Sequence, residues 1–191
     1  MTHKKEKPAI KSMAVYCGHQ LGENPAFARD AETLGKLMAE NKIKLVFGAG
    51  NVGLMGVIAT SVMKHRGAAI GVSTPHVVAK QEPVHEKIET EIKDNLLERK
   101  ARMIELADAF CILPGGMGTL NEVTDILTMH QIGEIGQPVY FLNTGGYWNV
   151  FGEMLKQMIS EGFIKTQSEY NMQVFDTPEE IIAAYNARFF D

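Results

Sequence analysis

The chain of 191 residues has a formal net charge of −4, and 45% of its residues are hydrophobic while 22% are charged. This length suits one domain, and the hydrophobic content excludes disorder as the main state. The acidic balance argues against a nucleic-acid partner, because surfaces that bind nucleic acids are normally basic. No apolar run approaches the roughly 18 residues of a membrane span, so no membrane partner is expected.

The polar start of the chain predicts a tail before a single domain, and the two cysteines predict a cellular location. Residues 1–11 are polar and rich in lysine, and we expect them to form a flexible tail. Residues 12–191 are expected to form a single domain. Cys17 and Cys111 both lie in apolar runs, which favours buried thiols in a reducing compartment and therefore a cytoplasmic location.

From residue 13 onward, short apolar runs alternate with longer stretches of helical periodicity. Strands are predicted at 13–16, 44–47, 69–72, 109–113 and 138–142, and helices at 25–40, 54–66, 96–107, 119–129, 148–161 and 177–190. Gly67 is expected to cap the second helix. Residues 73–95 are less regular, and one strand around 88–92 is expected there. The alternation predicts a mostly parallel α/β sheet with helices on both faces, whose ligands bind in loops at the carboxyl ends of the strands.

The loop Gly48–Gly56 carries the pattern G-x-G-x-x-G between a strand and a helix. A dinucleotide site would also need an acidic residue at the end of the next strand. That strand ends at Val72-Ser73, so an oxidoreductase that uses NAD is a weak alternative. A loop that faces a phosphate or ribose of another nucleotide fold is favoured, with Gly50 and Asn51 as candidate substrate contacts. The glycines of the loop Cys17–Gly22 fit a plain turn equally well.

The loop Pro114–Thr119 places three glycines before a helix. The N-terminus of a helix favours an anion, and Thr119 is expected to cap this one. The G-K-[ST] ending of a Walker loop is missing, so ATP hydrolysis has no support and a monophosphate is the natural guest. Glu122 follows one turn into the helix, where a carboxylate could face a sugar attached to that phosphate.

The run Glu98-Arg99-Lys100 begins another predicted helix, with Arg102 following. A solvated basic turn is the ordinary explanation. Two cations in the first turn are mildly unfavourable against the helix dipole, which makes a functional use more credible. Neither a metal site nor an organic cofactor is expected from the sequence, because the usual metal and cofactor motifs are missing.

Three segments together resemble one family: Gly48–Gly56, Glu98–Lys100 and Pro114–Glu122. They are similar to the Lonely Guy (LOG) family of cytokinin riboside 5′-monophosphate phosphoribohydrolases, long labelled lysine decarboxylases, over about residues 13–163. The resemblance implies a Rossmann-like, doubly wound α/β fold and a homodimer. It implies hydrolysis of the N-glycosidic bond of N6-substituted adenosine 5′-monophosphates to a free base and ribose 5-phosphate. By motif position, Arg99 and Glu122 would be catalytic, and the substrate contacts would be Lys100, Gly115, Gly116, Met117, Gly118, Thr119 and Thr128.

The sequence departs from the family pattern at several positions, namely His19-Gln20, Ala49, Leu96-Leu97, Asn121 and Met129-His130. These departures bear on specificity for cytokinin precursors more than on nucleotide hydrolysis. A non-catalytic carrier of a phosphate-bearing ligand, like the molybdenum-cofactor carriers of the same fold, is the alternative function. The retention of both Arg99 and Glu122 argues against it.

Overall fold

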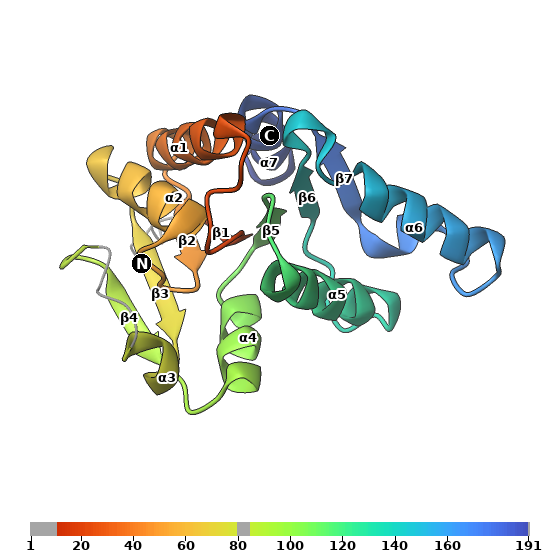
Figure 1. The fold of residues 1–191 in the computed structure, drawn as a ribbon, viewed down its shortest axis with the longest axis horizontal. Coiled ribbons are helices and arrows are strands. Elements are labelled where there is room, and N and C mark those ends of the chain that lie inside the picture. Colours follow the sequence, from red (N-terminus) through yellow and green to blue (C-terminus); the bar gives the residue numbers. More distant parts are fainter. Residues whose placement is uncertain (1–10, 80–84, 191) are drawn as a thin grey trace, which may run out of the picture.

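The structure is a computed structural model, which describes residues 11–79 and 85–190. Seven parallel strands form one sheet in the order β4-β3-β2-β1-β5-β6-β7 (Figure 1). The strands are β1 (Ser12–Tyr16), β2 (Lys44–Phe47), β3 (Ala69–Ser73), β4 (Glu89–Ile92), β5 (Ala109–Ile112), β6 (Val139–Leu142) and β7 (Met172–Phe175). The predicted parallel α/β sheet is therefore confirmed.

Helices cover both faces of this sheet. They are α1 (Pro25–Glu40), α2 (Gly53–Lys64), α3 (Pro75–Val78), α4 (Leu96–Glu105), α5 (Met117–Gln131), α6 (Asn149–Ser160) and α7 (Pro178–Phe189). Short 3-10 turns lie at Thr144–Gly146 and Gln167–Tyr170. One apolar cluster joins α1, α2 and α7 to the sheet, and a second joins α4, α5 and α6 to its opposite face.

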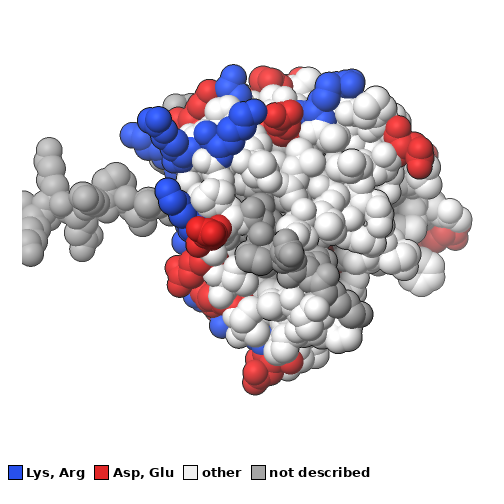
Figure 2. All heavy atoms as spheres, turned by 60° about the vertical axis from the view of Figure 1, so that its left-hand side comes forward, with Lys and Arg blue, Asp and Glu red and all other residues white. Residues whose placement is uncertain are grey.

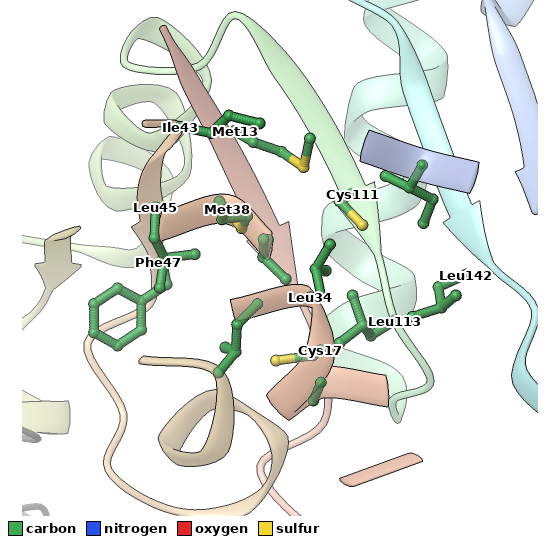
Figure 3. Packing of buried hydrophobic residues seen from close by; sticks show 14 of the residues in the cluster. Met13, Cys17, Leu34, Met38, Ile43, Leu45, Phe47, Cys111, Leu113 and Leu142 are labelled. Carbon is green, nitrogen blue, oxygen red and sulfur yellow. The ribbon is translucent and has the colours of Figure 1, made fainter. Parts of the chain in front are cut away.

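The central strand β1 shows why its sequence reads as an unbroken apolar run. Met13 and Val15 belong to the first cluster, while Ala14 and Tyr16 belong to the second. A parallel strand covered on both faces needs apolar side chains at every position. Cys17 lies in the first cluster with Cys111, and both thiols are free and buried (Figure 3).

The order of the strands reverses between β1 and β5. From β1 the chain passes through α1 to β2 on one side, and from β5 it passes through α5 to β6 on the other. The loops that leave these two strands meet, because the Gly18 amide donates to the Pro114 carbonyl at 3.0 Å. Ligands of open parallel sheets bind at such a reversal, so the fold predicts a ligand site at the glycine loops.

Some expected boundaries differ from the structure. The left-handed residue after α2 is Arg66, with φ of 61°, so Gly67 is not the cap. Instead, a Cβ at Gly67 would lie 2.7 Å from Val62 and 2.8 Å from Ala39, so close packing explains this glycine. The strand β7 was not predicted.

The expected tail falls almost wholly outside the described residues, since residues 1–10 are not among them. Lys11 belongs to the fold: its carbonyl accepts from the Lys44 amide at 2.8 Å, and its Nζ lies 3.3 Å from Asp108 Oδ1. On the face that brings β3 and β4 forward, lysine, arginine, aspartate and glutamate side chains gather toward the margins (Figure 2). Within the described ranges no helix is long and apolar enough to cross a membrane.

Candidate active site

Arg99 is a buried charged residue at the carboxyl edge of the sheet. The Asn95 side chain caps α4 by accepting from the Glu98 amide, which places Arg99 early in the helix. Its Nε donates to the Val72 carbonyl at 2.9 Å and its Nη2 to the Gly48 carbonyl at 3.3 Å. The residue is 9% exposed. Two backbone carbonyls therefore hold the guanidinium across the ends of β3 and β2.

Gly48 leaves the space that this guanidinium occupies. A Cβ built at position 48 would lie 2.0 Å from Arg99 Nη2, which no real contact permits. The first glycine of the G-x-G-x-x-G pattern is thus explained by the arginine, not by a dinucleotide. The next residue, Ala49, has φ of 60° and so occupies a left-handed conformation that costs a residue with a Cβ roughly 1–2 kcal/mol.

Glu122 faces Arg99 from α5. Its Oε1 lies 3.5 Å from Arg99 Nη1, and its side chain is 15% exposed. The pKa of this carboxyl is raised from its ordinary 4.5 to about 7, chiefly by burial, which outweighs the lowering by Arg99 and Lys100, while Asp125 adds a smaller rise. A carboxyl that titrates near neutrality suits a general acid or base.

Two uncharged side chains, Tyr16 at the end of β1 and Cys17 directly after it, lie near Glu122. Tyr16 is 2% exposed and Cys17 is 6% exposed. Burial, and then the charge of Glu122, raises the pKa of the Tyr16 hydroxyl and of the Cys17 thiol well above their ordinary values. Both groups therefore stay protonated at neutral pH, and neither competes with Glu122 for a cation.

The N-terminus of α5 lies open at the strand-order reversal. The helix begins after Gly116, and neither a side-chain cap nor an acidic residue occurs in its first turn. A Cβ at Gly116 or Gly118 would meet no atom within 4 Å, so both glycines face open space, and Met117 between them is 79% exposed. Backbone amides approached from this side suit an anion.

Thr119 has a different place from the one expected. It lies in the third position of α5 and is 3% exposed, so it does not cap the helix. A Cβ at Gly115 would lie 2.2 Å from Thr119 Oγ1 and 2.9 Å from the Gly18 amide nitrogen. The buried Thr119 side chain therefore packs against the loop at Gly115.

A hollow of about 220 Å³ lies between the loops that follow β1 and β5. Its lining comes from the first loop, from the start of the third loop, and from aromatic and apolar side chains nearby: Gly18, His19, Gln20, Leu21, Gly22, Phe27, Leu54, Pro114, Gly115, Gly116 and Tyr147. The Tyr147 hydroxyl donates to the Gly115 carbonyl at 2.5 Å. His19 is exposed and lines this hollow.

The remaining candidate contacts have other partners or line other grooves. Lys100 Nζ donates to Asp125 Oδ2 and to Asn121 Oδ1 on α5. The Thr128 hydroxyl donates to the Thr124 carbonyl at 2.7 Å, and Thr128 lines a groove of about 600 Å³ between α4 and α5 with Lys100. Gly50 and Asn51 belong to the loop that carries Gly48, and Asn51 lines a separate open groove beside α2.

The family model described as possible lysine decarboxylase matches residues 55–185 of this chain. A cytokinin riboside 5′-monophosphate phosphoribohydrolase of Rhodococcoides fascians is 34% identical over 93% of this chain and 90% of its own. The chain belongs to the LOG family. The cytokinin riboside 5′-monophosphate phosphoribohydrolase LOG7 of Arabidopsis thaliana is 37% identical over 83% of this chain and 73% of its own.

Solved structures confirm the fold of this LOG-family chain. The molybdenum cofactor binding protein from the phototrophic bacterium Rippkaea orientalis aligns with a TM-score of 0.68, at 21% identity over 95% of this chain and 99% of that one. A Moco carrier protein of Chlamydomonas aligns with a TM-score of 0.66, at 18% identity over 93% and 96% of the two chains. At these identities the likeness extends to the fold alone.

Sequence reasoning missed two residues that interact electrostatically with Glu122 in this LOG-family chain. Tyr16 ends β1 and Asp125 follows Glu122 by three positions on α5. The second had a signal, because residues i and i+3 share a helix face. No group of three or more His, Cys, Asp or Glu residues suited to a metal ion occurs in the part of the chain that the structure describes.

Proposed function

We propose that this LOG-family protein hydrolyses the N-glycosidic bond of adenosine 5′-monophosphates, including N6-substituted ones, to a free base and ribose 5-phosphate. The observation that carries the proposal is the pair of Arg99 and Glu122, 3.5 Å apart at the carboxyl edge of the sheet. The names of relatives that are 34% and 37% identical support it.

The chemistry of this pair fits glycosidic cleavage. When the bond between C1′ and the base nitrogen breaks, both of its electrons go to the base. The ribose is left with positive charge in an oxocarbenium-like state. Ionised Glu122 would stabilise that charge or accept a proton from the water that attacks C1′. Arg99 would hold Glu122 and offer its other N–H groups to oxygen atoms of the substrate. The base leaves with the electron pair of that bond and takes up a proton, which balances the proton that the attacking water loses.

The open N-terminus of α5 supports the rest of the substrate arrangement. The phosphate would bind at the backbone of Gly115, Gly116, Met117, Gly118 and Thr119, because an anion is stabilised by the amides and dipole of a helix start. The ribose would then extend toward Glu122, with Gly50 and Asn51 on the neighbouring loop. A contact from Lys100 or Thr128 would come from the groove between α4 and α5.

A non-catalytic carrier of a phosphate-bearing ligand is the alternative. The molybdenum-cofactor proteins named above share the fold at 18–21% identity, which supports no transfer of their ligand. A carrier has no need for a carboxyl whose pKa is raised to about 7 beside an arginine. Copurification of a pterin, together with no base release from any nucleotide, would favour the carrier.

Base release from purified protein tests the proposal. AMP and N6-isopentenyl-AMP are incubated with the wild type and the free base is measured by chromatography. Glu122→Ala and Arg99→Ala are expected to lose at least about 100-fold in rate, the usual contribution of a general base or a charge-stabilising group. Glu153→Gln, which alters an exposed ion pair on α6, is the matched control and should keep the wild-type rate. Normal turnover by a folded Glu122→Ala variant would contradict the proposal.

We also propose that the protein acts as a cytoplasmic homodimer, as the resemblance to the family implies. The groove between α4 and α5 offers apolar side chains for such contact, since Leu97 at its edge is 74% exposed. Light scattering of the purified protein measures the molar mass, and the mass of a single chain would contradict this assembly.

A further inference from the structure

Two consecutive cations of α4 reach acidic residues of α5 that lie one turn apart. Arg99 Nη1 is 3.5 Å from Glu122 Oε1. Lys100 Nζ donates to Asp125 Oδ2 at 2.5 Å and to Asn121 Oδ1 at 2.9 Å. Because positions i and i+3 share one face of a helix, both contacts join the same face of α5 to α4.

The burial of Lys100 distinguishes this ion pair from ordinary surface pairs. The Lys100 side chain is 11% exposed and that of Asp125 is 39% exposed. By contrast, Lys156 and Glu153 on α6 are 68% and 71% exposed. A lysine that has lost most of its water depends on its acceptors, whereas an exposed pair contributes little. Lys100 is thus committed to α5 in this structure.

We propose that Lys100 and Asp125 are positioning residues, whose ion pair between α4 and α5 sets the electrostatic surroundings of the Glu122 carboxyl beside Arg99. The catalytic consequence rests on the proposed function. The positioning itself does not depend on which substrate binds, so the two ideas can fail separately.

The charges around Glu122 determine the direction of each effect. Arg99 and Lys100 face it from α4, Asp125 from its own helix, and the neutral Tyr16 and Cys17 from the end of β1 and the loop after it. The pKa of Glu122 is raised to about 7, chiefly by burial; within that balance Lys100 lowers the pKa and Asp125 raises it. Loss of the Asp125 charge should therefore lower the pKa, and loss of the Lys100 charge should raise it.

A carbon-13 NMR titration of the Glu122 carboxyl tests the proposal without any substrate. The protein is labelled at the side-chain carboxyl of glutamate, and the Glu122 signal is assigned by its loss in Glu122→Gln. Asp125→Asn should move the titration midpoint down and Lys100→Met should move it up, each by roughly half a unit to one unit. The double variant Lys100→Met/Asp125→Asn should return toward the wild-type midpoint, because the two charges are removed together.

Conservative and remote variants separate positioning from a merely structural role. Asp125→Glu and Lys100→Arg keep the charges and should keep the wild-type midpoint, and they remain informative where a neutral variant fails to fold. Lys156→Met removes the exposed cation of α6 and should change nothing at Glu122. An unchanged midpoint in folded Asp125→Asn and Lys100→Met would overturn the proposal, even if both variants melt at lower temperature.

The pH profile of base release supplies the catalytic readout. The acidic limb of kcat/KM should follow the NMR midpoint in each variant, because that limb reports the pKa of the essential group in the free enzyme. NMR midpoints that move as expected in a protein without base release would refute the proposed function and keep the positioning pair. Base release together with unchanged NMR midpoints would support the proposed function and refute the positioning pair.

Discussion

At the scale of single residues, the site is built around one buried guanidinium. Arg99 has five N–H donors in a fixed planar arrangement. The carbonyls of Val72 and Gly48 and the carboxyl of Glu122 engage three of its nitrogen atoms. A buried charge needs such partners, because burial without them costs several kcal/mol. The two carbonyls fix the guanidinium plane, so its contact with Glu122 depends on Gly48 as much as on α5.

Gly48→Ala should therefore damage the site through Arg99. The new Cβ would lie 2.0 Å from Arg99 Nη2, so the guanidinium must leave its carbonyl partners. A displacement of about 1 Å can cost roughly 100-fold in rate, and we expect at least that loss of kcat/KM in base release. Overpacking should also lower the free energy of unfolding by about 1–3 kcal/mol.

Gly152→Ala provides the matched control for this substitution. Gly152 lies within α6, where a Cβ would meet no atom within 4 Å. Its activity should equal that of the wild type, and its free energy of unfolding should rise by up to about 1 kcal/mol, since alanine is the better helix former. Wild-type kcat/KM in Gly48→Ala would show that Arg99 does not need its present position.

At the scale of elements, local chemistry predicted those helices whose ends carry explicit signals. The run Thr177-Pro178-Glu179-Glu180 predicted a helix start, and Thr177 and Glu180 form a reciprocal capping box in the structure. Asn24 likewise caps α1 with a proline at the next position. Such signals are contained within four residues, so the sequence alone is sufficient to read them.

The missed strand β7 shows the limit of that approach. Its four residues, Met172–Phe175, are half-buried or exposed, because the strand lies at the edge of the sheet. Its identity comes from pairing with β6, in which Val139 is opposite Met172 and Leu142 is opposite Phe175. Pairing partners 33 residues apart leave no local periodicity, and strand preference depends strongly on such partners.

The candidate site was predictable as a location but not as a geometry. Glycine loops after strands indicated the carboxyl edge of the sheet, and the structure has them there. Periodicity and spacing gave no sign that Arg99 and Glu122 would meet, and only the resemblance to the family joined them. Their contact arises because α4 and α5 lie on the same face of the sheet, which is a property of the topology.

At the scale of the whole molecule, a buried titratable site couples function to stability. Glu122 has a pKa near 7 in the folded chain, and His130, also buried, has a pKa below its ordinary 6.5 because of burial. A raised carboxyl pKa makes the folded state bind more protons than the unfolded state, so stability falls as pH rises through that window. A lowered histidine pKa has the opposite effect, so stability rises with pH up to about 6.5. The two slopes oppose one another in the wild type.

The difference between wild type and Glu122→Gln isolates the carboxyl, because the His130 contribution is common to both. Between the ordinary pKa of 4.5 and the folded value of about 7, the wild type should lose roughly 3 kcal/mol of unfolding free energy that the glutamine variant keeps. Urea unfolding at pH 4.5, 6 and 8 measures this difference, which should grow through the window and stay constant above it. Glu91, whose pKa is lowered to about 2 by its hydrogen bonds with Arg102 and Lys93, contributes equally to both proteins, so its effect also cancels from the difference. Parallel stability curves for the two proteins would mean that the carboxyl is already ionised at pH 5, and a general base that titrates near neutrality would then have to be found elsewhere in the site.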